Sequence, residues 1–187
     1  MEFLEVIKTR YSVRDFSDKE IPDDILKEIL EAGRLAPSCQ NRQCWRYIVV
    51  KNKEKLYALA MKSGLIGKVN FFIKNAPLII VAVANPKDSC RLNGQDYYLV
   101  DVGISFQQMM LTAWNFSVGS CWLAAFNEQK VKEILEIPQK YKVVALSPFG
   151  YPKNKKSIYS NLVSAFAKSK KRFPLEKTVF YDKWGGK

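Results

Sequence analysis

Two kinds of apolar spacing alternate along the chain. Apolar residues recur at three- and four-residue intervals, the spacing of an amphipathic helix, in segments 2–9, 22–33, 53–61, 97–114 and 128–137. Short apolar runs typical of buried strands occupy 47–50, 78–83, 120–126 and 143–146. Because helices and strands alternate, the pattern predicts an α/β or α+β sandwich with a sheet of about four or five strands.

The segment 97–114 is apolar on several sides. Its large apolar residues include Val100, Ile104, Met109, Met110 and Leu111. A helix that is apolar over so much of its circumference must be covered. We therefore expect it either inside a core or against another subunit.

The regular pattern ends after Gly150-Tyr151-Pro152. The last 35 or so residues mix lysines with aromatic residues, which is too aromatic for a disordered tail. We expect residues 1–187 to form a single domain, in which about 153–187 form a C-terminal arm that packs elsewhere, for example on a partner subunit.

Length and composition fit one soluble domain. The chain has 187 residues, of which 48% are hydrophobic, enough for one core. No apolar run reaches the roughly 18 residues of a membrane span, so we expect no membrane partner. The start, Met-Glu-Phe-Leu-Glu, is acidic and amphipathic, unlike a signal peptide. These features predict a cytoplasmic protein.

The net charge of +12 indicates an anionic partner. A nucleic acid, an acidic surface and a phosphorylated small molecule all fit that charge. The excess is concentrated near the C-terminus, since residues 137–175 contain no Asp or Glu.

Cysteine and histidine usage narrows the chemistry. Four cysteines, at positions 39, 44, 90 and 121, form no CxxC pair, and we expect free, mostly buried thiols and no metal site. With no histidine, catalytic triads and dyads that need an imidazole base are excluded. The sequence also lacks GxGxxG and the P-loop motif, so a Rossmann module or a P-loop is not indicated.

One short segment carries a candidate anion site. In an extended Arg10-Tyr11-Ser12-Val13-Arg14, residues 10, 12 and 14 point the same way. Two guanidiniums and a hydroxyl on one side suit a phosphate and neighbouring oxygens. The alternative is a solvated loop with surface arginines.

Several ordered motifs resemble one known family. They are Arg10-Tyr11-Ser12-Val13-Arg14-Asp15-Phe16, Ala36-Pro37-Ser38-Cys39-Gln40-Asn41-Arg42-Gln43-Cys44-Trp45, Asn75-Ala76-Pro77-Leu78-Ile79-Ile80-Val81, Gly119-Ser120-Cys121-Trp122-Leu123, Phe149-Gly150-Tyr151-Pro152 and Lys170-Lys171-Arg172-Phe173-Pro174-Leu175-Glu176. Together they are similar to the nitroreductase family of FMN flavoproteins over nearly the whole chain.

The resemblance implies a fold and a site. The fold would be an α+β sandwich with a central, mainly antiparallel sheet of four or five strands flanked by helices, in an intertwined homodimer with exchanged C-terminal arms. Each FMN would lie between the subunits. The family pattern assigns flavin contacts to Arg10, Ser12 and Arg14, to Pro37, Ser38 and Asn41 of the other subunit, to the backbone of Leu123 and Ala124 at the reactive edge, and to Lys170 and Arg172 at the phosphate.

The resemblance also implies an activity. NAD(P)H would give a hydride to flavin N5 and leave, and a nitroaromatic, quinone or similar acceptor would then take the electrons. Arg14 would stabilise negative charge on the reduced flavin, and no side chain need act as acid or base. The alternatives are a flavin carrier or sensor of the same fold without turnover, and a basic nucleic-acid-binding protein.

Some positions depart from the family pattern or stay open. Cys44 stands where many members have proline, and Ala125 where glycine often follows the flavin-edge strand. Lys68 and Asn70 are both candidates for the middle-segment flavin contact. The aromatic residues Trp45, Phe71, Phe72 and Trp122 fit either pocket walls or core.

Overall fold

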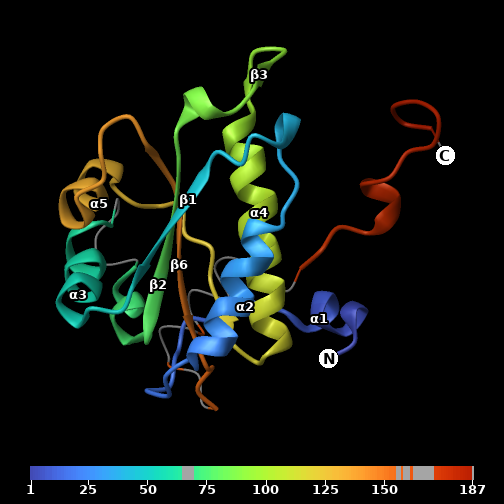
Figure 1. The fold of residues 1–187 in the computed structure, drawn as a ribbon. Coiled ribbons are helices and arrows are strands. Elements are labelled where there is room, and N and C mark those ends of the chain that lie inside the picture. Colours follow the sequence, from blue (N-terminus) through green and yellow to red (C-terminus); the bar gives the residue numbers. More distant parts are fainter. Residues whose placement is uncertain (65–69, 155–156, 158–160, 162–170, 187) are drawn as a thin grey trace. The chain divides into compact units, whose positions relative to one another are not determined.

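The computed structural model describes residues 1–64, 70–154, 157, 161 and 171–186 (Figure 1). The chain forms two compact units, residues 1–155 and 156–187. Among the described residues, the first unit contains the central sheet and five α-helices, and the second contains a short 3-10 helix.

The central sheet of the first unit has four strands in the order β1-β2-β6-β5. They are β1 (Trp45–Val50), β2 (Leu78–Ala84), β6 (Lys142–Gly150) and β5 (Gly119–Ser120). All three pairings are antiparallel. The expected mainly antiparallel sheet of an α+β protein is therefore confirmed.

Helices cover both faces of this sheet (Figure 1). The helices are α1 (Phe3–Thr9), α2 (Asp23–Arg34), α3 (Lys53–Lys62), α4 (Tyr97–Asn115) and α5 (Glu128–Leu135). All seven residues of β2 are buried. Ile79, Val81 and Val83 pack in the core that contains residues of α3 and α5. Leu78, Ile80 and Ala82 pack in the core that contains residues of α2 and α4. A strand buried on both faces explains the continuous apolar run of β2.

Polar residues fix the ends of several helices. The Asn52 and Asn127 side chains accept hydrogen bonds from backbone N–H groups in the first turns of α3 and α5. Glu136 adopts a left-handed conformation with φ 58° and ends α5 before Ile137, the predicted end.

The expected strand 120–126 is wrong beyond its first residue. Strand β5 covers only Gly119–Ser120. The Cys121 N–H then donates to the Ser147 hydroxyl instead of to a strand neighbour, and Leu123 pairs with Leu146 in an isolated bridge. The segment 121–126 is therefore fixed by isolated hydrogen bonds and bridges, without the continuous pairing of a β-ladder.

The structure also contains a hairpin that the apolar pattern did not predict. Strands β3 (Arg91–Leu92) and β4 (Gln95–Asp96) pair around Asn93 and Gly94, which have φ values of 52° and 75°. An Asn-Gly pair with positive φ is a strong hairpin signal. The 3-10 helices are η1 (Cys39–Asn41), η2 (Phe71–Asn75), η3 (Pro86–Asp88) and η4 (Leu175–Lys177). Among the described residues, every helix is too short or too polar to cross a bilayer.

Candidate functional site

Segment 10–16 is held between the ends of two strands. Ser12 forms a parallel bridge with Ser120 of β5, where the Val13 N–H donates to the Ser120 carbonyl over 2.9 Å. Phe16 forms an antiparallel bridge with Pro152, just after β6. The Val13 and Phe16 side chains are buried in the core, so the backbone of this segment has a fixed position.

Three residues of this segment, Arg10, Ser12 and Arg14, influence the buried thiol of Cys121. Burial raises the pKa of the Cys121 thiol, while the charge of Arg14, a hydrogen bond with Ser12 and the charge of Arg10 lower it. The side chains of all three residues therefore lie near enough to influence the same thiol. Their side chains are half-buried. The expectation that residues 10, 12 and 14 share a side and bind one ligand stays a prediction.

Gly119 permits the close approach of this segment to β5. A Cβ added at Gly119 would lie 2.8 Å from the Cβ of Val13, too close for any real pair. We expect Gly119→Ala to destabilise the protein by about 1–3 kcal/mol, because either Val13 or the strand must move. Urea unfolding measures this change. An unchanged midpoint would show that the segment is not held by this contact.

Leu123 and Ala124, expected at the reactive edge of a flavin, lie in the segment 121–126 after β5. The Leu123 N–H donates to Leu146 over 2.8 Å, and the Leu123 carbonyl accepts from Leu146 over 3.1 Å. These two hydrogen bonds fix the backbone at Leu123, and they already use its N–H and C=O groups. Asn70, 2% exposed, donates from Nδ2 to the Ala125 carbonyl over 2.8 Å. Asn70 therefore holds the Ala125 carbonyl in place, and its expected flavin contact stays a prediction. The other candidate, Lys68, lies outside the described residues.

The second set of predicted contacts lies in the loop 37–43. The Ser38 hydroxyl accepts from the Gln43 N–H over 2.9 Å. Gln40, Asn41 and Gln43 have φ values of 51°, 54° and 48°. Such left-handed conformations cost of order 1–3 kcal/mol each for residues other than glycine. The loop must therefore be held in this shape by its surroundings.

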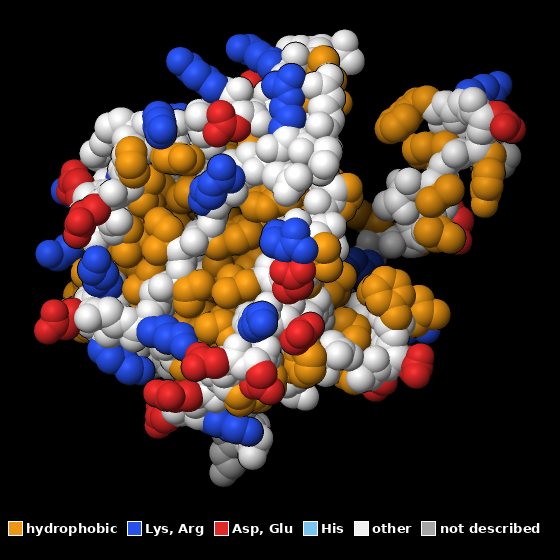
Figure 2. Space-filling view, in the orientation of Figure 1, with side chains coloured by type: hydrophobic (Ala, Val, Ile, Leu, Met, Phe, Trp, Pro, Cys, Tyr) orange, Lys and Arg blue, Asp and Glu red, His pale blue; other side chains and the backbone are white. Residues whose placement is uncertain are grey.

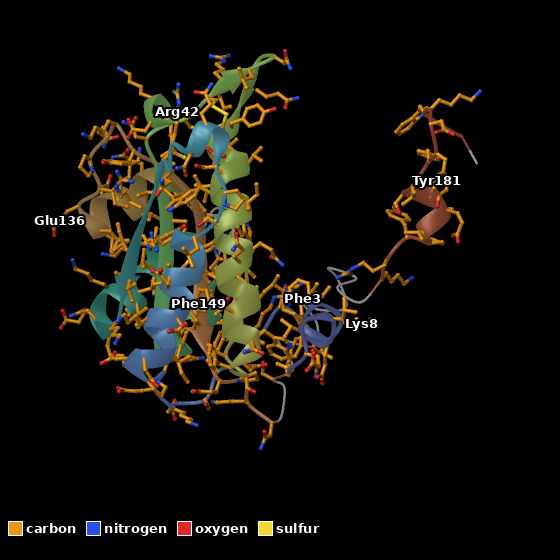
Figure 3. All side chains as sticks on the ribbon, turned by 45° about the vertical axis from the view of Figure 1, so that its right-hand side comes forward. Phe3, Lys8, Arg42, Glu136, Phe149 and Tyr181 are labelled. Carbon is orange, nitrogen blue, oxygen red and sulfur yellow. A yellow bond between two sulfur atoms is a disulfide. The ribbon has the colours of Figure 1, made fainter. Side chains whose placement is uncertain are left out.

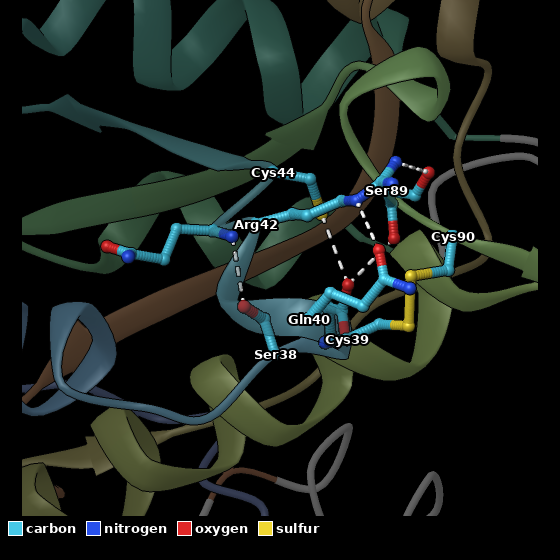
Figure 4. The surroundings of a disulfide bond; sticks show 9 residues. Ser38, Cys39, Gln40, Arg42, Cys44, Ser89 and Cys90 are labelled. Atoms are coloured by element: carbon cyan, nitrogen blue, oxygen red, sulfur yellow. Dashed lines mark hydrogen bonds between the residues drawn. A yellow bond between two sulfur atoms is a disulfide. The ribbon is translucent and has the colours of Figure 1, made fainter.

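A disulfide helps to hold the loop in this shape. Its presence shows that the expectation of four free cysteines was wrong. Cys39 and Cys90 are bonded, with their Cα atoms 6.1 Å apart and a separation of 51 positions in sequence (Figure 4). The Cys39 N–H also donates to Asp101 Oδ1 over 2.8 Å. Spacing alone cannot reveal a pairing between distant cysteines. Only Cys44 and Cys121 remain free thiols, and both are buried as expected.

Cys44, which stands where many family members have proline, also contacts Asp101. Its Sγ lies 3.6 Å from Asp101 Oδ2, an oxygen that accepts from the Ser89 hydroxyl over 2.8 Å. Burial and then the Asp101 charge raise the pKa of Cys44 to about 11. Cys44 is thus a neutral thiol at physiological pH.

The two sets of predicted contacts lie at opposite ends of α4. Cys39 bonds to Asp101 in the first turns of α4, whereas Thr9, next to Arg10, accepts from Trp114 Nε1 in the last turn. Trp114 is 13 positions after Asp101, which corresponds to roughly 20 Å along the helix at 1.5 Å per residue. Figure 3 shows this separation, with Arg42 near one end of α4 and Phe3 and Lys8 near the other. One chain does not bring both sets together.

The arm residues are described less fully. Lys170 lies outside the described residues. Arg172 is exposed in the second unit, whose position relative to the first is not defined, so the expected meeting of both chain ends stays a prediction.

The aromatic candidates divide into core and surface. Trp45 and Phe72 are buried, as the core interpretation requires. Phe71 is half-buried, with Lys74 Nζ 3.8 Å above its ring. Trp122 is 36% exposed and meets Phe106 edge to face, with ring centroids 5.3 Å apart. A supported but exposed indole can contact a ligand.

Known proteins are similar to this chain in sequence and in structure. A family model described as the nitroreductase family matches residues 7–64 and 67–151. A protein of Archaeoglobus fulgidus, named as a candidate NADH dehydrogenase/NAD(P)H nitroreductase, is 35% identical over 162 residues, 84% of this chain and 90% of its own length.

Two solved structures are similar over nearly the whole chain. A nitroreductase family protein from Clostridium novyi NT has a TM-score of 0.78 and 35% identity, covering 100% of this chain and 96% of its own. An FMN-dependent nitroreductase from Clostridium difficile R20291 has a TM-score of 0.78 and 29% identity, covering 97% of this chain and 99% of its own. With a family model that matches most of the chain and a fold shared along its length, the protein belongs to the nitroreductase family.

Proposed function

We propose that the protein is a cytoplasmic, FMN-dependent NAD(P)H oxidoreductase that reduces a nitroaromatic, a quinone or a similar acceptor. One observation carries the proposal: both sets of flavin contacts are built into ordered segments, but at opposite ends of α4. Two chains can complete a site that one chain cannot. Relatives named as NAD(P)H nitroreductases and as an FMN-dependent nitroreductase support the cofactor and the donor.

The residues around Cys121 fit the polar part of FMN. Arg10 and Arg14 place two permanent cations beside the Ser12 hydroxyl on a fixed backbone. Guanidinium groups bind phosphate and carbonyl oxygens with paired, charge-assisted hydrogen bonds. In this proposal Lys170 and Arg172 add further charge at the phosphate, and Pro37, Ser38 and Asn41 of the partner subunit complete the site.

Two exposed apolar surfaces support the homodimer. On α1, Phe3, Leu4 and Ile7 are 69%, 63% and 47% exposed, and on α4, Val100 and Ile104 are 47% and 40% exposed. Val100 and Ile104 lie near the start of α4, whereas α1 lies beside the end of α4, so these side chains form two exposed apolar surfaces. Apolar patches of this kind mark interaction sites.

Gly103 is a second argument for an interface on α4. A Cβ at this position would meet no atom within 4 Å, so nothing inside the chain requires glycine there. Glycine within a helix costs about 1 kcal/mol relative to alanine. Close approach by a helix of a second copy explains why α4 has a glycine here.

The C-terminal arm, about residues 153–187 of a single domain, would pack on the partner. Strand β1 is an edge strand, and along it lies a groove of about 660 Å³ lined by Leu30, Arg34, Arg42, Gln43, Trp45, Arg46, Tyr47 and Val49. Figure 2 shows apolar side chains gathered on this face. The arm offers suitable groups, since Phe173, Leu175 and Tyr181 are apolar or aromatic and Glu176 is acidic.

The protein's part in the reaction is to bind and position. FMN, when bound, supplies hydride acceptance and electron donation. The guanidinium of Arg14 would stabilise the negative charge of the reduced flavin, and as a fixed cation it need not reorganise during the reaction. Asn70 and Leu146 fix the backbone of 123–125 beside the reacting face. Trp122 offers an aromatic surface to a ring-shaped acceptor.

The absorbance spectrum of the purified protein tests the proposal. We expect a flavin spectrum that NADH or NADPH bleaches and that a quinone or nitroaromatic restores. A flavin that neither nicotinamide bleaches would indicate a carrier or sensor. Colourless protein with salt-sensitive retention on nucleic acid would instead favour nucleic-acid binding.

A further inference from the structure

The Cys39–Cys90 disulfide ties down the loop that is proposed to contact the flavin. Cys39 lies directly between Ser38 and the Gln40-Asn41 pair, and Cys90 lies just before β3, on a different part of the chain. The bond therefore links the proposed cofactor loop to a segment that makes no proposed flavin contact. Anything that breaks the bond acts first on this loop.

The loop conformation depends on such outside support. Three residues, Gln40, Asn41 and Gln43, are left-handed although none is glycine. Two further bonds hold the loop to other segments: Cys39 N–H to Asp101 over 2.8 Å, and Arg42 Nη1 to the Ser89 carbonyl over 3.1 Å. The disulfide differs from these bonds because redox chemistry can remove it without changing the sequence.

The neighbouring thiol does not compete for the bond. Cys44 also contacts Asp101, but it is 1% exposed and its pKa is raised to about 11 by burial and by the Asp101 charge. Thiol–disulfide exchange requires a thiolate, so Cys44 is a poor attacking group. Cys39 is partly exposed, whereas Cys90 is only 6% exposed. An outside thiolate therefore reaches Cys39 first.

We propose that Cys39 and Cys90 form a reversible thiol–disulfide site that sets the flavin affinity of the loop. This inference rests on the proposed FMN function. A small dithiol is the reductant: its thiolate attacks Cys39 Sγ, the Cys39–Cys90 bond breaks, and Cys90 leaves as a thiolate that takes up a proton. The second thiol of the reductant then attacks the mixed disulfide, which releases Cys39 as a thiol and the reductant as a cyclic disulfide. Two electrons and two protons pass to the protein. In a reducing cytoplasm, a disulfide of this kind is typically transient and redox-sensing.

The proposal predicts linked effects on binding and reduction. We expect FMN to bind about 10-fold more weakly after reduction, because the loop loses its covalent hold and must be ordered on binding. By reciprocity, bound FMN should make the disulfide harder to reduce by the same factor. If the disulfide were merely structural, its reduction would lower the overall stability of the protein without this coupling.

The experiment compares wild-type protein, stripped of flavin, in its oxidised form and after treatment with dithiothreitol. Flavin fluorescence titration gives the FMN Kd of each form, and far-UV circular dichroism checks that both are folded. Alkylation of the unfolded protein counts free thiols, with two expected in the oxidised form and four in the reduced form. Cys39→Ser with Cys90→Ser is the matched control, since its Kd should equal that of reduced wild type and should not respond to dithiothreitol.

The outcomes separate the two claims. A weaker Kd only in the reduced wild type and in the double variant supports the redox site. Equal affinity of oxidised and reduced wild type overturns it and leaves the flavin function standing. Four free thiols in protein kept under air overturn it as well. Absence of FMN binding by either form overturns the proposed function together with this inference.

Discussion

Replacing Arg10 and Arg14 together by alanine is expected to weaken FMN binding by about 100-fold or more. Each guanidinium can make charge-assisted hydrogen bonds worth about 1.5–3 kcal/mol, and each 1.4 kcal/mol is a factor of ten in Kd. Flavin content after purification and fluorescence titration measure the loss. The fold should be retained, because Val13 and Phe16, not the arginines, anchor the segment in the core.

The matched control is Arg91→Ala with Lys140→Ala. It removes the same charge from exposed positions outside the proposed site. If the control loses as much FMN as Arg10→Ala with Arg14→Ala, general attraction by a basic protein would explain binding and the specific site would be wrong. Arg10→Ala with Arg172→Ala extends the test to the arm. Full flavin content in that variant would exclude a shared phosphate site at the two chain ends.

The second large effect is expected at the exposed face of α4. Ile104→Glu should convert the dimer to a monomer and remove the flavin at the same time. A carboxylate in an apolar interface must be desolvated without a partner, which costs several kcal/mol for each of two symmetric copies. Light scattering gives the mass, and absorbance gives the flavin content.

Tyr57→Glu is the control for this variant. Tyr57 is 54% exposed on α3, so the change also introduces a carboxylate at an exposed aromatic position. It should remain a dimer with bound flavin. A monomeric Ile104→Glu protein that keeps tightly bound FMN would contradict the shared site.

Sequence reasoning predicted the fold well where one physical pattern dominates. The run in β2 identifies a strand buried on both faces, and helices α2 and α4 follow their apolar spacing closely. The strand prediction failed at 121–126, where an apolar run looks like a strand but the chain is fixed by isolated hydrogen bonds, such as that from Cys121 to Ser147. A pattern of residue types does not show which partner a backbone group finds.

The site could be predicted in part. The alternation of Arg10, Ser12 and Arg14 predicts a common side, and the structure holds the backbone of this segment by a bridge between Ser12 and Ser120. The Cys39–Cys90 bond escaped prediction because no spacing rule joins cysteines 51 residues apart. The separation of the two contact sets also depends on the length of α4 and on its contacts at each end.

A mixed dimer tests the shared site most directly. One chain carries Arg10→Ala with Arg14→Ala. The other carries Ser38→Asp with Asn41→Asp, which places carboxylates at the proposed flavin contacts of the loop. Each variant alone should purify without flavin. When the two are coexpressed with different tags and the mixed dimer is isolated, one of its two sites combines intact arginines from one chain with an intact loop from the other.

We expect one FMN per mixed dimer, measured by absorbance against protein concentration. A mixed dimer without flavin would contradict the shared site, because a site built within one chain is defective in both variants.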